Sequence, residues 1–256
     1  SLSDKKLAHW KKIMQGVALH ISDDGVVEQF KGYMGLEELD WDYYREKYAD
    51  IHRLDRILKS EGKSPDDYKL AKQADFLMSF YNLGTEEVQH IIEELGYKLP
   101  EVFGTRNFDY YIQRTSHGST LSRLVHARLA WEMGMTDTGW ELYMDALRSD
   151  LVDIQGGTTG EGVHCGVMAG TVYDVLVSYA GLNLNGEVPA LAPNLPGHWK
   201  GLKFSFTFRG KSFLVSITGK QIKISGENMG KDQIKLHLCG KEVELSDGKT
   251  LTLTQE

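Results

Sequence analysis

The residue types best suited to chemistry are concentrated in one stretch, Arg114-Thr115-Ser116-His117-Gly118-Ser119-Thr120-Leu121-Ser122, which directly precedes an apolar helical segment. Hydroxyl groups, a glycine and main-chain amides at the N-terminus of a helix form a binding site for an anion such as phosphate. Ser and Thr are also common helix caps, so a plain capped helix start with a loop histidine explains the same residues. The stretch by itself leaves both interpretations open.

A second candidate is the glycine-rich stretch Gln155-Gly156-Gly157-Thr158-Thr159-Gly160-Glu161-Gly162-Val163-His164, which leads into a strongly apolar segment. Glycines let the main chain come close to a ligand, and His164 in the first helical turn would face the same point. A tight turn that needs positive φ angles is the alternative explanation. Nucleotide binding is disfavoured, because the stretch lacks the preceding strand and the lysine of a phosphate-binding loop.

Two further stretches carry side chains that suit a sugar. Lys72-Gln73-Ala74-Asp75 lies within an expected helix, and Glu28 and Gln29 stand between aliphatic and aromatic residues. Amide and carboxylate groups hydrogen-bond hydroxyls, although a solvated helix face or a surface carboxylate is the commoner explanation. A metal site is poorly supported, since the nine histidines are scattered and neither an HExxH nor a CxxC pattern occurs.

The spacing of apolar residues predicts helices before Gly181 and strands after it. Steps of three and four residues predict helices over 7–17, 41–58, 64–83, 85–96, 119–133, 137–148 and 163–179. Asp40 and Ser64 are the expected caps of the second and third helices, and the last helix, apolar on most sides, should be buried. Alternation predicts strands over 202–208, 212–217, 221–224, 234–238 and 243–245, as in a small antiparallel sandwich.

This change of pattern divides the chain into a helical region, residues 1–181, and a β-sandwich domain, residues 182–256. The join over 181–201 holds three of the five prolines, and we expect it to be a wrapped linker rather than a free hinge. No internal repeat or low-complexity stretch is evident, which disfavours a solenoid and a disordered tail.

Composition limits the class of protein. The 256 residues carry a net charge of −7, which disfavours binding to nucleic acid or to an anionic membrane through the bulk field of the chain. Only two cysteines occur, which excludes a disulfide scaffold and favours a reducing, cytoplasmic location. The sequence contains neither a stretch long enough to span a membrane nor the apolar core of a secretion signal at its start.

Taken together, the stretches described above resemble the C-terminal part of glycoside hydrolase family 65, the family of maltose, kojibiose, nigerose and trehalose phosphorylases and of some hydrolases. The similar segments keep the family's order and cover nearly the whole chain: Glu28–Tyr33, Asp55–Leu58, Lys72–Asp75, Arg114–Ser122, Gln155–His164 and the β-rich tail. Several motifs in the same order are far more specific than any one of them alone.

The resemblance implies a mainly helical fold with a β tail. Residues 1–181 would form the second half of an (α/α)6 barrel, and residues 182–256 a small antiparallel jelly-roll-like domain. The implied reaction is the inverting phosphorolysis of an α-glucoside disaccharide to β-glucose 1-phosphate, with inorganic phosphate as co-substrate and no other cofactor. By motif match Ser119, Thr120 and His164 would bind phosphate, and Lys72 and Gln73 the transferred glucose. Additional pocket residues would be Glu28, Gln29, His117 and Glu161.

One departure from the family pattern has consequences for activity. The family's general acid is a Glu in a Gly-Pro-Asp-Glu-Tyr-His segment that precedes the region similar to residues 1–30, and this chain does not contain it. We therefore expect an incomplete enzyme that is inactive by itself. A half-barrel leaves apolar helix faces without partners, so we also expect self-association or binding of the missing N-terminal half, through the stripe formed by Leu7, Trp10, Ile13, Met14 and Val17.

Two other functions fit the same residues. A hydrolase of the same family would need a carboxylate base where phosphate sits, and Glu161 is the nearby candidate. A non-catalytic carbohydrate-binding or assembly module is compatible with the missing acid. A hydrolase would differ from a phosphorylase in not depending on phosphate. A binding module would differ from both in binding sugar without turnover.

Overall fold

The computed structural model describes residues 2–73, 75–154, 157, 159–228 and 233–255. The chain divides into two compact units, Ser1–Met168 and Ala169–Glu256, and each has its own hydrophobic core. Helix α9 (Cys165–Asp174) crosses the boundary, and a π-helical turn (Val175–Tyr179) continues it. Within the described part of the chain, we find no helix with the length and apolar character needed to cross a bilayer.

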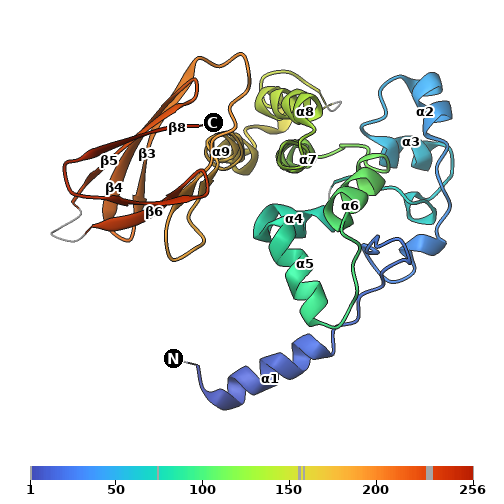
Figure 1. The fold of residues 1–256 in the computed structure, drawn as a ribbon. Coiled ribbons are helices and arrows are strands. Elements are labelled where there is room, and N and C mark those ends of the chain that lie inside the picture. The colour runs from blue at the N-terminus through green and yellow to red at the C-terminus, as the bar shows by residue number, and fades with distance from the viewer. Residues whose placement is uncertain (1, 74, 155–156, 158, 229–232, 256) are drawn as a thin grey trace. The chain divides into compact units, whose positions relative to one another are not determined.

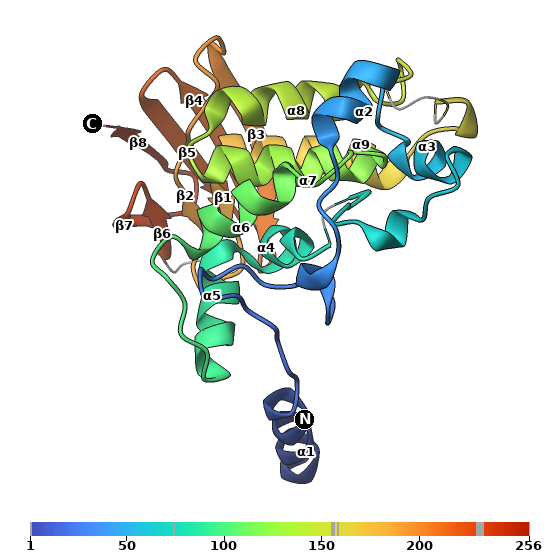
Figure 2. The ribbon, with the colours of Figure 1, turned by 90° about the vertical axis from the view of Figure 1, so that its right-hand side faces the viewer.

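The first unit is helical (Figure 1). Its α-helices before α9 are α1 (Asp4–Gln15), α2 (Trp41–Tyr48), α3 (Leu54–Ser60), α4 (Leu77–Leu83), α5 (Thr85–Glu94), α6 (Phe103–Ile112), α7 (Thr120–Glu132) and α8 (Thr136–Arg148). Short 3-10 turns occur at Tyr33–Gly35, Pro65–Asp67 and Thr159–Glu161. Helices α7 and α8 lie side by side in both views, because the connection at Gly134, with φ of 80°, reverses the chain (Figure 2).

Side chains from α4 to α7 form the main core of this unit. Phe80 and Phe103 meet edge to face with ring centroids 5.6 Å apart. Asn107 on α6 is fully buried and joins the core to the segment around residue 27, since its Oδ1 accepts the Val27 N–H at 2.9 Å and its Nδ2 donates to the Gly25 carbonyl at 2.9 Å. A second cluster lies beneath α2 and α3, built from Leu39, Tyr44, Ile51, Leu54 and Leu58.

The helix predicted over 41–58 is in fact two helices. Asp40 caps the first as expected, because its Oδ1 accepts the Tyr43 N–H at 3.0 Å. The chain leaves the helix at Ala49, which has a φ of 57°, and α3 begins five residues later at Leu54. The apolar spacing continues across this break, so spacing alone could not locate it.

The helix predicted over 64–83 was mostly wrong. Only a 3-10 turn forms after Ser64, and regular helix begins at Leu77. Between them the described residues form no regular helix, and at Ala71 the main-chain N–H donates to the Arg114 carbonyl while the carbonyl accepts the Ser116 N–H. These long-range hydrogen bonds replace the local helical ones. Helix α6 was not predicted from the sequence, and its first residues carry no side-chain cap.

The second unit is a sandwich of two four-stranded sheets. One sheet has the order β1-β2-β6-β7 and the other β3-β4-β5-β8. The strands are β1 (Leu182–Asn183), β2 (Ala190–Leu191), β3 (Gly201–Phe208), β4 (Lys211–Thr218), β5 (Gln221–Glu227), β6 (Ile234–Leu238), β7 (Lys241–Leu245) and β8 (Thr250–Thr254). All neighbours are antiparallel except β2 and β6, which are parallel. The last strand, β8, was not predicted.

Alternation places the apolar side chains of both sheets in one core. Phe213, Val215 and Ile217 of β4 are buried, and so are Leu236 and Leu238 of β6. Phe206 and Phe213, which face each other across β3 and β4, stack with ring centroids 4.7 Å apart. This agrees with the expected β domain, to which the wrapped linker contributes the short strands β1 and β2.

The prediction of a wholly buried final helix was wrong. Val163, just before α9, and Val172 within it are 70% and 66% exposed. Val167 is buried, and it packs with Leu124 of α7 and Ala146 of α8.

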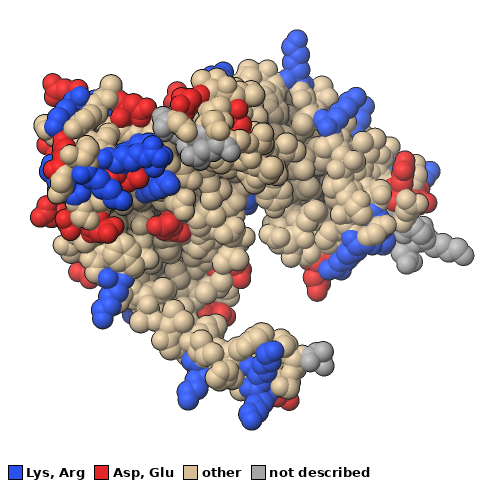
Figure 3. Space-filling model, turned by 180° about the vertical axis from the view of Figure 1, so that it is seen from behind, with Lys and Arg blue, Asp and Glu red and all other residues tan. Residues whose placement is uncertain are grey.

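Basic and acidic side chains are interspersed on the face of the molecule shown in Figure 3.

Candidate functional site

The segments that carry Lys72 and His117 lie side by side. The Gly118 N–H donates to the Lys72 carbonyl at 3.0 Å, next to the bridge between Ala71 and Thr115. A Cβ atom on Gly118 would lie 2.4 Å from the His52 carbonyl oxygen and 3.2 Å from Lys72 Cγ, so the approach requires glycine. Contrary to prediction, Lys72 and Gln73 lie in a bend that follows this bridge and not in a helix.

A third segment, at the start of α3, lies close to Gly118 and Lys72. No role in the site was predicted for it from the sequence. Although burial opposes ionisation of Asp55, Arg53 and, less strongly, Lys72 hold the pKa of its carboxyl below the ordinary value. Burial and the nearby Arg123 guanidinium lower the pKa of His52. Residue types could not have predicted that this segment lies beside Gly118, because the close approach involves the main-chain carbonyl of His52.

The start of α7 leaves hydroxyl groups beside the main-chain amides. Ser119 occupies the N-cap position in an extended conformation, with φ of −129° and ψ of 139°, and its side chain makes no capping hydrogen bond. Thr120 is the first helical residue and is buried, with 5% exposed. A helix N-terminus whose amides have no intrahelical partner, next to a hydroxyl, suits an anion.

Two histidines support this helix start in neutral form. Nδ1 of His117 lies 2.9 Å from the Ser122 hydroxyl, and Nδ1 of His126 donates to the Ser122 carbonyl at 2.8 Å. The two rings meet nearly at right angles, 4.8 Å between centroids. Burial lowers the pKa of His117 to about 2 and that of His126 to about 4. Both rings therefore act as neutral hydrogen-bonding groups at pH 7.

His164 is held by Asp150, a residue that the sequence analysis missed. The Asp150 carboxylate lies 2.6 Å from His164 Nδ1 and also accepts the His164 main-chain N–H at 2.7 Å. Asp150 is two residues beyond the C-terminus of α8, so its partner fourteen residues later could be found only from the tertiary structure. Packing of Val167 against Leu124 places the first turn of α9 against α7, the helix that carries Thr120.

The structure describes the local surroundings of two other predicted pocket residues, Glu28 and Gln29. The Glu28 carboxylate stabilises the turn that follows it, because it accepts hydrogen bonds from the main-chain N–H groups of Gly32 at 3.1 Å and Met34 at 3.0 Å. These hydrogen bonds, led by that from Met34, lower the pKa of Glu28. Gln29 is half-buried, with no recorded partner for Nε2 among the described residues. The side chain of Glu161 lies outside the described residues, as do the predicted stretch members at 74, 155, 156 and 158.

Both the helical part and the β-rich part of the chain match a known family. The glycosyl hydrolase family 65 central catalytic domain matches residues 1–173, and the family's C-terminal domain matches residues 182–245. A trehalose 6-phosphate phosphorylase of Lactococcus lactis is 45% identical over 215 residues, which cover 84% of this chain and 28% of that protein. A kojibiose phosphorylase of Halothermothrix orenii is 26% identical over 98% of this chain and 30% of its own length.

A solved structure agrees with the fold. A putative kojibiose phosphorylase from the human microbiome superposes over 100% of this chain and 35% of its own, with a TM-score of 0.74 at 21% sequence identity. The chain thus spans about a third or less of the length of these proteins. Because the central catalytic domain of the family matches more than half of its residues, the chain belongs to glycosyl hydrolase family 65.

Proposed function

We propose that this chain provides the glucose-binding and phosphate-binding side of an inverting phosphorylase, which converts an α-glucoside disaccharide and inorganic phosphate into β-glucose 1-phosphate. The observation that carries the proposal is the hydrogen bond from Gly118 to Lys72, because it holds the two predicted binding segments together. Family membership and the 45% identity to a trehalose 6-phosphate phosphorylase support this class of reaction. The name of that relative makes trehalose 6-phosphate the first disaccharide to test.

Each group has a separate task in this reaction. Lys72 and Gln73 bind hydroxyls of the transferred glucose, and Ser119, Thr120 and His164 bind phosphate on the face opposite the leaving sugar. A phosphate oxygen forms the new bond to the anomeric carbon while the bond to the leaving oxygen breaks, and a carboxylic acid gives that oxygen a proton. Phosphate is already an anion, so this displacement needs no general base.

We assign the acid's task to no carboxylate of this chain, since its 256 residues contain no Gly-Pro-Asp-Glu-Tyr-His segment. Proton donation typically contributes about 10²–10⁴-fold to such rates. The chain by itself should therefore bind phosphate and release no measurable glucose 1-phosphate from maltose, trehalose, kojibiose or trehalose 6-phosphate.

Calorimetric titration with inorganic phosphate tests the site. Ser119→Ala and His164→Asn should each raise the phosphate Kd about tenfold, the effect of about one charge-assisted hydrogen bond. Ser60→Ala, at an exposed serine that ends α3, is the matched control and should leave the Kd unchanged. A wild-type chain that does not bind phosphate would contradict the site, and robust release of glucose 1-phosphate would contradict the assignment of an inactive chain.

Helix α1 presents an exposed apolar surface to which a partner could bind. This helix has no buried residue. The five apolar side chains of the stripe on α1 and just after it are between 40% and 55% exposed: Leu7, Trp10, Ile13, Met14 and Val17. Contiguous apolar patches of this kind mark protein interfaces on soluble proteins. We propose that the stripe binds a second copy of the chain or another part of the enzyme.

A further inference from the structure

A buried arginine connects the segment just before α7 to the segment that ends at Ile154. The Arg123 side chain lies on the first turn of α7 and is 4% exposed. A guanidinium is removed from water at considerable cost unless its N–H groups find acceptors. Its partners therefore show what the protein uses this cation for.

Two of those partners are main-chain carbonyls from separate segments. Nη1 donates to the His117 carbonyl at 3.0 Å, and Nη2 donates to the Ile154 carbonyl at 3.3 Å. His117 directly precedes Gly118, Ser119 and Thr120, whereas Ile154 directly precedes the glycine-rich stretch. The third contact is an ion pair at 3.5 Å from Nε to Asp145, whose side chain is 51% exposed.

We infer that Arg123 is a positioning residue of the phosphate site, because its guanidinium sets the spacing between the segment that runs from His117 to Thr120 and the segment that ends at Ile154. This inference rests on the proposed function. Arg123 need not touch phosphate, since Nη1 and Nη2 donate to carbonyl oxygens and Nε pairs with Asp145. His117, three residues before α7, and Ile154 are thereby bound to one planar group.

The geometry of the guanidinium explains why arginine occupies this position. Its planar fork presents several N–H groups in fixed directions, so two carbonyls bound to it are held at a fixed distance from each other. A lysine ammonium is a single point on a flexible chain, which can reach one carbonyl well but does not define the distance between two. The His117 main chain has a φ of 53°, a conformation that is uncommon without glycine, and the Arg123 hydrogen bond stabilises it.

Arg123→Lys is the variant that separates charge from geometry. Arg128→Lys is a matched control on the same helix, at an arginine that pairs with Glu132 at 2.9 Å and stacks on Tyr81. Asp145→Asn is a second control that removes the ion pair and keeps both carbonyl contacts. For each protein we would measure the Kd of inorganic phosphate, the melting temperature, and amide hydrogen exchange at 117–119 and 157–164.

Arg123→Lys should raise the phosphate Kd about tenfold and should accelerate exchange in both segments together. Both controls should keep the Kd within about twofold of wild type. A purely structural role would lower the melting temperature of Arg123→Lys without a selective change at these segments. An unchanged Kd, or faster exchange in only one segment, would overturn the inference.

The failure of the proposed function gives a different result. If the wild type binds no phosphate, the phosphate site is wrong, and hydrogen exchange alone decides the positioning role: joint acceleration supports it and its absence overturns it. If Arg123→Lys does not fold, Arg123→Gln takes its place, since the Gln amide can donate to one of the two carbonyls and the same joint acceleration is expected.

Discussion

Asp150 binds His164 through both of its carboxylate oxygens. Oδ1 lies 2.6 Å from the ring atom Nδ1, and Oδ2 accepts the main-chain N–H at 2.7 Å. The Asp150 side chain is 6% exposed, while the His164 side chain is 28% exposed. The pair therefore fixes both the ring and the main chain of His164, with Nε2 on the side of the ring away from the carboxylate.

Asp150→Asn should weaken this arrangement. An amide keeps one oxygen for the His164 main-chain N–H, but its NH2 group would face Nδ1, so the ring would change tautomer and lose its hydrogen bond to a charged group. We expect a loss of about 1–3 kcal/mol in the free energy of unfolding, and weaker phosphate binding. Urea unfolding and phosphate titration measure the two effects. Asp42→Asn, at a carboxylate that is 95% exposed, is the control and should change neither. Equal behaviour of the two variants would refute a special role for Asp150.

Gly118→Ala should separate the segments that carry Lys72 and His117. The new Cβ atom would meet the His52 carbonyl at 2.4 Å, and a main-chain oxygen cannot move aside as a flexible side chain can. We expect a loss of about 1–3 kcal/mol in stability, measured by urea unfolding. At Gly35 a Cβ atom would meet nothing within 4 Å, so Gly35→Ala is the matched control. A Gly118→Ala protein as stable as the control would show that the close approach is not required.

The buried histidines should make stability depend on pH below 6.5. The folded pKa of His126 is lowered to about 4, so between these values the unfolded chain binds a proton that the folded chain does not. Stability from this group is complete above pH 6.5 and falls by roughly 3 kcal/mol as the pH drops to about 4. His126→Asn keeps an N–H donor for the Ser122 carbonyl and removes the titration. Its urea-unfolding profile should be flatter over this range, and an identical slope would contradict the prediction.

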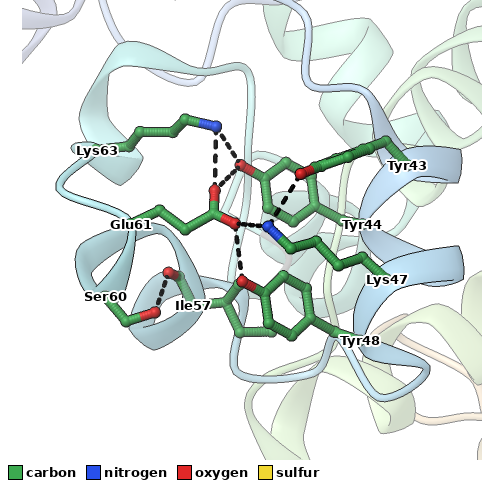
Figure 4. Close-up of polar contacts among 8 residues, drawn as sticks. All are labelled: Tyr43, Tyr44, Lys47, Tyr48, Ile57, Ser60, Glu61 and Lys63. Carbon is green, nitrogen blue, oxygen red and sulfur yellow. Dashed lines mark hydrogen bonds and ion pairs between the residues drawn. The ribbon is translucent and has the colours of Figure 1, made fainter.

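Glu61 should contribute to stability through four hydrogen bonds (Figure 4). Its carboxylate accepts from Lys47 at 2.6 Å, Tyr48 at 2.7 Å, Tyr44 at 2.8 Å and Lys63 at 3.0 Å. These contacts, led by that from Lys47, lower its pKa, so the stability they provide should be lost as the pH falls below 4.5.

Glu61→Gln should therefore lower the melting temperature at pH 7 and reduce the further loss at acid pH. Glu242→Gln is the control, because Glu242 pairs with Lys235 on the surface of the second unit, where both side chains are about half exposed. Thermal melts at pH 7 and pH 4 measure both variants. A Glu61→Gln protein with the same melting temperature as the control would contradict a stabilising role.

The exposed stripe on α1 should cause association. Trp10 and Ile13 are 48% and 55% exposed, and we expect wild-type chain to elute from gel filtration above the size of a monomer. Replacing both residues by Ser should shift the elution towards the monomer. Leu214→Ser, at a residue that is 58% exposed in the second unit, is the control. A wild-type protein that stays monomeric at high concentration in light scattering would contradict the interface.

Local patterns in the sequence predicted much of the fold. The alternation from Leu202 to Phe208 predicted a strand that pairs as expected with the next one, and the apolar spacing from Ser119 to Met133 predicted α7 within one residue. Asp40 was identified as a cap because capping involves neighbouring residues only. Such features depend on contacts within a few residues, where side-chain type decides the local structure.

The tertiary structure decided how the candidate site is built. Lys72 was expected on a helix, yet the next residue back, Ala71, donates its main-chain N–H to the Arg114 carbonyl and accepts the Ser116 N–H, which keeps this segment out of a helix. Such bonds carry no side-chain signal, so residue types cannot reveal them. Asp150 and Arg123 act on partners fourteen and thirty-one residues away, and only the packing of α7, α8 and α9 makes those contacts possible. The sequence by itself determined which residue types could bind an anion, and the folded chain determined which carbonyls and carboxylates hold them.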